Sequence, residues 1–366
     1  MKNKDFLEKI KEGATEVFVY NNKEGSRGPG TKQNLPFYNP SMQLNRDLSV
    51  VLCEFLVNSS KKELKLLDGL AASGIRGVRF ANEIEGNFEV FVNDWNEESY
   101  KLIKKNIKKN SLENVESYNK NLNALLSEEK FDYIDIDPFG SPVYFIDSAM
   151  RSIKDNGVIA LTATDTATLC GVYPQVCWRR YSAMPFHCVC MKEVGLRILI
   201  GFVCRIAGMY DKEIMPILSY VTDHYFRAYV HIRKGAKKAN KSMKNLKILN
   251  SGKIGIDEVK RDIGPLWMGN LQDKKTVQSL RSIIFEKNTG YNKDLWKLLD
   301  LIEEESEMPM FFYTTDSLSS LLKKSSPKSI VFFEKLRKQG YNVSKTHFSQ
   351  TGFKTDATFD IIKKSF

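Results

Sequence analysis

FDYIDIDPFGSP, residues 131–142, joins an apolar run to a rigid turn. The alternating apolar residues predict a buried strand, and Asp137-Pro138 ends it because proline cannot continue a hydrogen-bonded ladder. In open α/β sheets ligands bind beyond the carboxyl ends of the strands. We therefore expect a binding site in which Phe139 stacks on a flat base, while Asp137 and the Pro138 carbonyl accept hydrogen bonds from an exocyclic amine. The alternative is an ordinary strand-to-helix turn with Asp137 near a helix N-cap.

Segments upstream predict a nucleotide cradle. A strand at residues 64–67 runs into the small-residue turn DGLAASGIRG (68–77), and a helix follows at 78–84. Small side chains let the backbone approach a ligand closely. The next strand, at 88–93, ends in Asp94, where such folds bind a ribose hydroxyl pair. The alternative for Asp94 is an ordinary surface aspartate.

The end of the sheet distinguishes between related folds. A third strand at 115–118 precedes Asn121-Leu122, where an adenine edge would lie, and a fifth strand is expected at 158–163. After a long helix at 187–208, strands at 214–222 and 225–232 with a two-residue turn predict an antiparallel hairpin on a parallel sheet. That ending is typical of methyltransferases, and together with the missing GxGxxG motif it argues against a dehydrogenase.

Composition narrows the class of partner. The 366 residues suggest two domains, and 55 Lys and Arg against 44 Asp and Glu give a formal net charge of +11. This excess predicts a polyanionic partner, nucleic acid before membrane, although a generally lysine-rich composition is the alternative. The first residues are charged, and no apolar run is long enough to span a bilayer. Six cysteines in apolar segments are expected to be reduced, in a cytoplasmic protein.

The second half predicts a separate module. Residues 234–247, KGAKKANKSMKNLK, have six lysines and no acid, so we expect an exposed interdomain segment that either contacts phosphates or is simply solvated. The predicted domains are therefore residues 1–235 and 236–366. Helices followed by the basic segment 344–355 indicate a small winged-helix-like module near the C-terminus.

Nine stretches carry a resemblance to a known family. They are FYNPSMQLNRDLSV (37–50), DGLAASGIRGVRFA (68–81), IDIDPFGSPVYFIDSAMRS (134–152), LTATDTATLCGVYPQVCWRRY (161–181), EVGLRILI (193–200), YVTDHYFRAYVHIRKG (220–235), GPLWMG (264–269), FFYTTDSLSS (311–320) and SKTHFSQTGFKTDA (344–357). Over nearly its whole length, the chain resembles the archaeal-type tRNA (guanine-26-N2) dimethyltransferases. The likeness is specific, because ordinary methyltransferases share only the glycine turn and the acidic residue.

The resemblance implies a fold and an activity. The fold is α/β: a class I S-adenosylmethionine-dependent methyltransferase, with a Rossmann-like sheet ending in an antiparallel hairpin, plus a smaller α+β C-terminal domain that binds RNA. The implied enzyme transfers one or two methyl groups from S-adenosyl-L-methionine to the exocyclic N2 amine of guanosine 26 in tRNA. Asp137, Pro138 and Phe139 are its catalytic residues. We expect a monomer that needs no metal.

The resemblance also implies binding residues. The expected cofactor contacts are Arg46, Asp68, Gly69, Arg76, Asp94, Asn121 and Leu122. Separately from the resemblance, we expect five basic residues to contact RNA phosphates: Arg27, Arg179, Arg180, Lys345 and Lys354. Two features depart from the family pattern: Asn121-Leu122 replaces the usual Asp-Ala pair, and residues 205–366 lack the cysteine quartet of many relatives. The asparagine carbonyl oxygen still suits an adenine amine. The remaining cysteines match no common zinc spacing and are expected to lie in the core.

Two other functions remain open on the sequence alone. The same fold could methylate an amine of DNA adenine or of another RNA guanine, since Asp-Pro-aromatic turns serve several such enzymes. A protein that binds or folds RNA and merely keeps a cofactor pocket is the non-enzymatic alternative. The intact Asp68, Asp94 and Asp137 argue against it.

Overall fold

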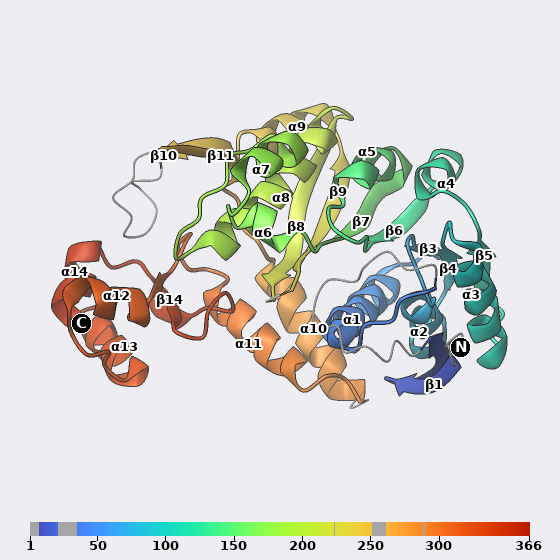
Figure 1. Cartoon of the computed structure of the whole chain (residues 1–366), viewed down its shortest axis with the longest axis horizontal. Helices are drawn as coiled ribbons and strands as arrows, with labels where there is room; N and C mark the ends of the chain where they lie inside the picture. The colour runs from blue at the N-terminus through green and yellow to red at the C-terminus, as the bar shows by residue number, and fades with distance from the viewer. Residues whose placement is uncertain (1–6, 21–34, 223, 251–260, 288–289) are drawn as a thin grey trace, which may run out of the picture.

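A seven-stranded sheet forms the centre of the molecule (Figure 1). The computed structural model describes residues 7–20, 35–222, 224–250, 261–287 and 290–366. The strand order is β5-β4-β3-β6-β7-β9-β8. The strands are β3 (Leu64–Asp68), β4 (Phe88–Asn93), β5 (Val115–Tyr118), β6 (Phe131–Ile136), β7 (Ile153–Ala163), β8 (Lys212–Val221) and β9 (Phe226–Lys234). β3 to β7 are parallel, and β9 is antiparallel to both β7 and β8. The predicted terminal hairpin is confirmed.

Helices cover both faces of the sheet because successive strand residues point to opposite sides. In β3, Leu66 packs into one hydrophobic cluster and Leu67 into the other. Helices α1 (Gln43–Ser59), α2 (Ile75–Glu83) and α3 (Glu97–Lys109) contribute to the Leu66 side. Helices α4 (Leu122–Glu128), α5 (Val143–Ser152) and α8 (Met191–Gly208) contribute to the Leu67 side. Because β3 to β7 run parallel, their carboxyl ends lie at one common edge of the sheet.

An N-terminal hairpin packs beside this sheet. β1 (Leu7–Glu12) pairs antiparallel with β2 (Thr15–Tyr20), and a 3₁₀ turn (Pro40–Met42) leads into α1. The side chain of Asn106 in α3 bonds the backbone of Phe18 in both directions, through Phe18 N at 2.7 Å and Phe18 O at 3.0 Å. The hairpin thereby brings Glu12 toward the start of α1.

The lysine-rich segment after the sheet has exposed lysines, as predicted, but part of it is a helix packed on the sheet and not a solvated linker. Residues Ala236–Met243 form helix α9, which packs on β8 and α8. Its lysines face outward, while the small side chains of Ala239 and Ser242, three residues apart, are buried. β10 (Leu246–Asn250) then pairs with β11 (Asp262–Trp267), whose Leu266 and Trp267 join the core of the sheet. Helix α9 could not be predicted from the sequence because its buried face has no large apolar residue.

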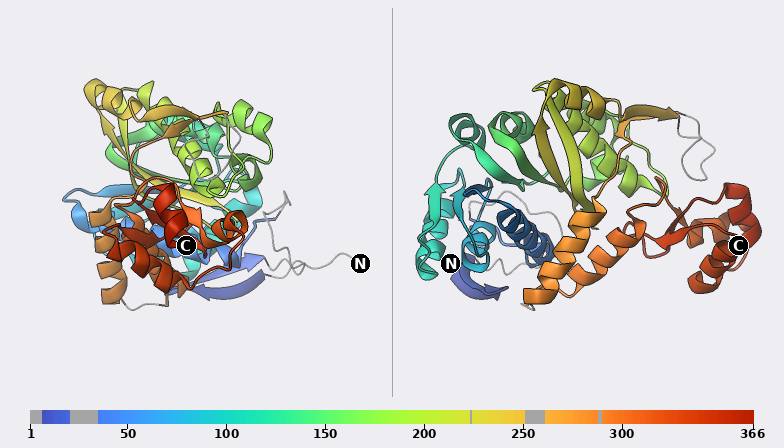
Figure 2. Two further views of the ribbon diagram at one scale, coloured as in Figure 1. Left: turned by 90° about the vertical axis from the view of Figure 1, so that its left-hand side faces the viewer. Right: turned by 180° about the vertical axis from the view of Figure 1, so that it is seen from behind.

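The C-terminal part consists of two long helices and a small module. Helices α10 (Lys274–Lys287) and α11 (Asp294–Glu305) pack against α1, beneath the sheet in Figure 1. The module that follows has a three-stranded sheet, β12-β14-β13, and its own aromatic core. Its elements are β12 (Tyr313–Thr314), α12 (Thr315–Leu322), α13 (Ser329–Lys338), β13 (Val343–Lys345), β14 (Gly352–Thr355) and α14 (Phe359–Ser365). It lies at one end of the molecule (Figures 1 and 2).

The cysteines behave as core residues. All six are free thiols; Cys188 is partly exposed and the other five are buried, as expected. Within the described ranges, no group of three or more His, Cys, Asp or Glu side chains is arranged to hold a metal ion. No helix in the described part of the chain is long and apolar enough to cross a bilayer.

Candidate active site

Polar residues gather at the carboxyl ends of four neighbouring strands. β3 ends at Asp68, Asp94 follows β4, Asn121 comes shortly after β5, and Asp137 follows β6. In the sheet these strands lie in the order β5-β4-β3-β6. The predicted cofactor residues and the predicted catalytic residue therefore share one edge, at the place where open α/β sheets bind ligands.

The turn after β6 is fixed by the neighbouring strand. Gly140 has a positive φ of 87°, which glycine tolerates without strain. Its N–H donates to Thr164 Oγ1 at 2.7 Å, and its carbonyl accepts from Thr164 N at 2.9 Å. Phe139 is 52% exposed, and its ring meets that of Phe37 edge-on, with centroids 5.7 Å apart. An exposed aromatic face beside a held carboxylate suits a planar base.

Asp137 is the exposed end of a buried charged cluster. We call Arg76, Asp135, Asp137 and Arg227 the edge cluster. The guanidinium of Arg76 donates through Nη2 to Asp137 Oδ2, and its Nη1 lies 3.5 Å from Asp135 Oδ2. Within the described part of the chain, no donor bonds the other oxygen, Asp137 Oδ1. Asp137 therefore presents one acceptor oxygen outward while its partner arginine is held inside.

Asp135 connects the two arginines of the edge cluster. Arg227 Nη2 donates to Asp135 Oδ2 at 2.6 Å, and Arg227 Nη1 donates to Oδ1 at 3.0 Å. Both side chains are fully buried. Burial alone would raise the pKa of Asp135, but Arg227 and Arg76 outweigh it and lower that pKa. The Asp135 carboxylate thus compensates two buried positive charges.

Asp68 differs from Asp135 although it lies nearby. It is buried, and its Oδ2 accepts from Gly77 N at 3.0 Å. Burial raises the pKa of Asp68 to about 7, because Arg76, with its Nε 4.0 Å away, compensates only in part. A Cβ on the next residue, Gly69, would lie 2.9 Å from the carbonyl oxygen of Asp135. Glycine therefore lets this turn pack directly on β6.

Asp94 and Asn121 are arranged for a nucleoside. Asp94 Oδ2 accepts from Ala72 N at 2.8 Å and Oδ1 accepts from Asn96 N at 2.9 Å, so the carboxylate faces the small-residue turn. Burial raises the pKa of Asp94. Asn121 is exposed and caps α4 through its carbonyl oxygen, while Leu122 is buried against the core. A carboxylate for a ribose and an amide for a base edge, beside a turn without bulky side chains, fit a nucleoside-bearing cofactor.

Arg46 lies in a second buried ion pair that sequence reasoning missed. Its Nε and Nη2 each donate to a carboxylate oxygen of Glu12 at 2.6 Å. Glu12 also accepts from Arg79 Nη1 at 2.7 Å. Burial would raise the pKa of Glu12, but the two arginines lower it to about 2. The N-terminal hairpin thereby holds Arg46 at the rim of the site.

The predicted RNA contacts divide into three groups. Arg27 lies outside the described residues. Arg179 and Lys345 are exposed, and Arg180, at the end of α7 (Pro174–Tyr181), is partly exposed and donates to Asp165 at 3.1 Å. Lys354 is buried, with its ammonium 3.0 Å from Glu193 and 3.8 Å from Glu305. The expectation that Lys354 binds phosphates is therefore wrong for this structure.

Lys354 belongs to a cluster that joins the small module to the sheet. We call Glu193, Arg197, Glu305 and Lys354 the junction cluster. Arg197 donates to Glu193 through Nε at 3.0 Å and through Nη2 at 2.8 Å. Burial would raise the pKa of Glu193, but Lys354 and Arg197 lower it to about 2. The cluster links α8 to α11 and β14.

Asp135 and Arg227 are the main residues that sequence reasoning missed. A signal was present, because each is a charged residue with an apolar residue on either side in its strand. A charge at such a position is buried and must find a partner of opposite charge. The sequence did not reveal that the two residues were partners, because it does not give the register between β6 and the terminal hairpin.

The sheet order and the residues at its edge define a class I methyltransferase fold: a small-residue turn follows the first parallel strand, an acidic residue follows the second, and a hairpin ends the sheet. A family model described as N2,N2-dimethylguanosine tRNA methyltransferase matches residues 19–366. The chain belongs to this family.

Individual relatives agree with the family match. The tRNA (guanine(26)-N(2))-dimethyltransferase of Thermococcus kodakarensis is 42% identical over 351 residues, covering 89% of this chain and 91% of the relative. That of Methanococcus maripaludis strain C7 is 38% identical, covering 95% of each. The solved structure of Trm1 from Pyrococcus horikoshii with S-adenosyl-L-methionine superposes with a TM-score of 0.86 at 35% identity, covering 98% of this chain and 99% of that one.

Proposed function

We propose that this protein transfers one or two methyl groups from S-adenosyl-L-methionine to the N2 amine of guanosine 26 in tRNA. The observation that carries the proposal is the position of Asp137. It is one-fifth exposed, is held by Arg76, and lies beside an exposed phenylalanine at the edge that also bears Asp94 and the small-residue turn. Relatives of similar length bear the corresponding name. We further propose that the enzyme acts as a monomer in the cytoplasm.

The cofactor would be held by residues from the N-terminal hairpin to β5. When bound, S-adenosyl-L-methionine supplies an electrophilic methyl group on a positively charged sulfur. Asp94 accepts from the ribose hydroxyls and Asn121 accepts from the adenine amine, with Leu122 beside the ring. The turn that begins at Asp68-Gly69 takes the methionine part, near Arg76. Arg46 meets the methionine carboxylate through Nη1, because its Nε and Nη2 donate to Glu12 and to the carbonyl of Asn39.

Asp137 performs the chemistry on the base. Its carboxylate accepts a hydrogen bond from the N2 amine, orients the nitrogen lone pair toward the methyl group, and takes up the proton that nitrogen loses. The Pro138 carbonyl is the second acceptor, and Phe139 stacks on the ring. The guanine must leave its stack to reach this turn, at a cost of a few kcal/mol.

Most contacts with the RNA backbone would lie outside the turn that follows β6. Arg179, Arg180 and Lys345 are the described basic residues that we assign to phosphates, together with Arg27, which lies outside the described ranges. Phosphate contacts position RNA without specifying a base. In this division residues 1–235 carry the chemistry, and residues 236–366 add RNA-binding surface.

Analysis of methylated nucleosides tests the proposal. A tRNA transcript is incubated with the enzyme and the methyl donor, digested, and examined by mass spectrometry. We expect N2-methylguanosine and N2,N2-dimethylguanosine from a transcript with guanosine 26, and neither from a matched transcript with adenosine at that position. Equal modification of both transcripts, or methylation on another atom, would contradict the assignment. This outcome would favour a methyltransferase for a different RNA or DNA amine.

A further inference from the structure

Helix α7 presents an exposed tryptophan near the proposed active site. Trp178 is 51% exposed, and Gln175 and Arg179 on the same helix are exposed as well. These three residues lie on one side of α7, because positions i, i+3 and i+4 of a helix share a face. We call them the α7 face. Val172 and Tyr173, just before the helix, are also about half-exposed, so the tryptophan belongs to a larger apolar surface.

The opposite side of α7 holds the helix in the fold. Cys177 and Tyr181, four residues apart, are fully buried in the hydrophobic cluster on the Leu67 side of the sheet. Trp178 is not part of that cluster. Tryptophan is enriched at interfaces, where its large ring supplies much of the binding energy. An exposed tryptophan among other exposed apolar side chains, on a helix that packs without it, indicates a contact surface.

Hydrogen bonds attach α7 to the turn that carries Asp137. The hydroxyl of Tyr181 accepts from Ser141 Oγ at 2.8 Å and donates to Asp165 Oδ1 at 2.8 Å. Ser141 belongs to the turn after β6, and Asp165 follows the end of β7 by two residues. The last turn of α7 is therefore fixed beside the proposed base pocket, and Trp178 lies three residues before Tyr181.

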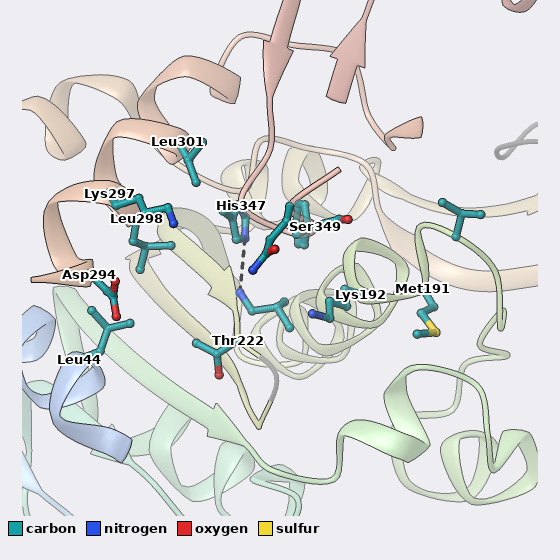
Figure 3. Close-up of a pocket in the computed structure, with 14 residues that line it drawn as sticks. Leu44, Met191, Lys192, Thr222, Asp294, Lys297, Leu298, Leu301, His347 and Ser349 are labelled. Carbon is teal, nitrogen blue, oxygen red and sulfur yellow. Dashed lines mark hydrogen bonds between the residues drawn. The ribbon is translucent and has the colours of Figure 1, made fainter. Parts of the chain in front are cut away.

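Along this edge of the sheet, α7 lies closer to Asp137 than the cavity beyond β8 does. β7, to whose end α7 is tied, is the neighbour of β6, at a spacing of about 4.8 Å. The end of β8 is three such spacings, or about 14 Å, from β6. Thr222 and His347 line the cavity there, which has a volume of approximately 530 Å³ (Figure 3). Of these two surfaces, the α7 face is the better placed for a nucleotide next to the target guanosine.

The proposed chemistry leaves such a nucleotide without a stacking partner. A guanine that leaves its stack takes one partner from each adjoining base, which is part of the cost of displacing it. The flat indole of Trp178 can replace that partner, since proteins hold unpaired nucleotides by stacking their bases on aromatic side chains. Arg179 is exposed beside it, whereas Arg180 is engaged by Asp165. The exposed arginine suits the phosphate of the same nucleotide.

We propose that Trp178 stacks on an unpaired base of the RNA strand next to the target guanosine, with Arg179 on the phosphate of that nucleotide. This inference rests on the proposed function, because it takes RNA with a displaced guanine as the substrate. The contact does not depend on the identity of the base, since every base has a flat face. Helix α7 thus helps to keep the strand open while Asp137 holds the guanine.

Three variants test the stacking contact: Trp178→Ala, Trp178→Phe and, as a control, Phe285→Ala. Phe285 is 78% exposed on α10, which packs on the opposite face of the sheet. Binding of a tRNA transcript is measured by titration without methyl donor, across a range of salt concentrations. We expect Trp178→Ala to bind at least fivefold more weakly, Trp178→Phe to recover most of that loss, and Phe285→Ala to bind like the unaltered protein. The salt slope of Trp178→Ala should stay unchanged, because stacking releases no counterions.

Tryptophan fluorescence gives a second readout, which a purely structural role of Trp178 would not change. Stacking on a base quenches the emission of an indole. The chain has four tryptophans, so the decrease in emission on adding tRNA is compared between the unaltered protein and Trp178→Phe. We expect a smaller decrease in the variant.

The controls and the methylation assay separate the two proposals. An equal decrease in emission in both proteins, or equal weakening of tRNA binding by Trp178→Ala and Phe285→Ala, overturns the inference. Either result leaves methylation by the unaltered enzyme intact, so the proposed function stands. If the unaltered enzyme methylates no tRNA, the proposed function fails on its own assay, whatever the titrations give.

Discussion

The edge cluster and the junction cluster are built from the same kinds of residue but have different surroundings. Each has two carboxylates and two cations, with at least one arginine. In the edge cluster, Asp137 is 20% exposed beside an exposed aromatic ring. In the junction cluster no side chain is more than 4% exposed. The edge cluster is therefore accessible to solvent at Asp137, which makes it open, whereas the junction cluster is buried on all sides, which makes it closed.

This difference in exposure indicates that the edge cluster serves catalysis and that the junction cluster holds parts of the fold together. A closed set of paired charges contributes little net stability, but removing one member leaves an uncompensated buried charge and costs several kcal/mol. It therefore fixes how α8, α11 and β14 fit together. An open set holds its exposed carboxylate in place while leaving that carboxylate accessible to a ligand. We infer that the edge cluster positions Asp137 and that the junction cluster orients the small module.

The largest effect on stability is expected at the centre of the edge cluster. Asp135→Asn removes the one carboxylate that lies between Arg76 and Arg227, so two buried cations lose their main partner. We expect the free energy of unfolding to fall by about 3–5 kcal/mol, measured by urea denaturation. Glu128→Gln, which breaks an exposed ion pair with Lys120, should change it by less than about 1 kcal/mol. Equal effects would mean that the edge cluster is not a buried network.

A somewhat smaller loss is expected when the junction cluster is broken. Lys354→Met leaves Glu305 with only His347 and Thr346 as partners, whereas Glu193 keeps Arg197, so we expect about 3 kcal/mol. Below its unfolding transition, the variant should bind tRNA as tightly as the unaltered protein. The exposed neighbour should show the reverse: Lys345→Met keeps its stability but lowers the salt slope of tRNA binding by about 1. A loss of binding in Lys354→Met without a loss of stability would contradict the structural role.

Glu193 in the junction cluster and Asp68 beside the edge cluster should make stability depend on pH in opposite directions. The pKa of Glu193 is lowered to about 2, so its contribution to stability is present above pH 4.5 and is lost as the pH falls toward 2. The pKa of Asp68, beside the edge cluster, is raised to about 7, so stability falls as the pH rises from about 4 to 7. Denaturation curves from pH 2 to 8 should show that Glu193→Gln removes the first dependence and Asp68→Asn the second. If neither slope changes, these groups do not titrate as described.

The sequence predicted the sheet well because local patterns define it. Apolar runs, the small-residue turn and the two prolines that flank Phe139 each act over a few residues. The charges were harder to place. Lys345 and Lys354 look equivalent in the basic segment, yet Lys354 pairs across the strands with the buried Ser344, whereas Lys345 occupies the next position and is exposed. Arg227 and Asp135 are 92 residues apart, and only the fold brings them together.

Single-turnover methyl transfer by Asp137→Asn, measured alongside donor affinity by calorimetry, tests the central claim most directly. The amide has the shape of the carboxylate but neither its charge nor its basicity. We expect the donor to bind with unchanged affinity while methyl transfer to a tRNA transcript slows by about 10²- to 10⁴-fold. A variant that binds the donor and methylates guanosine 26 at the full rate would contradict the claim that Asp137 receives the proton.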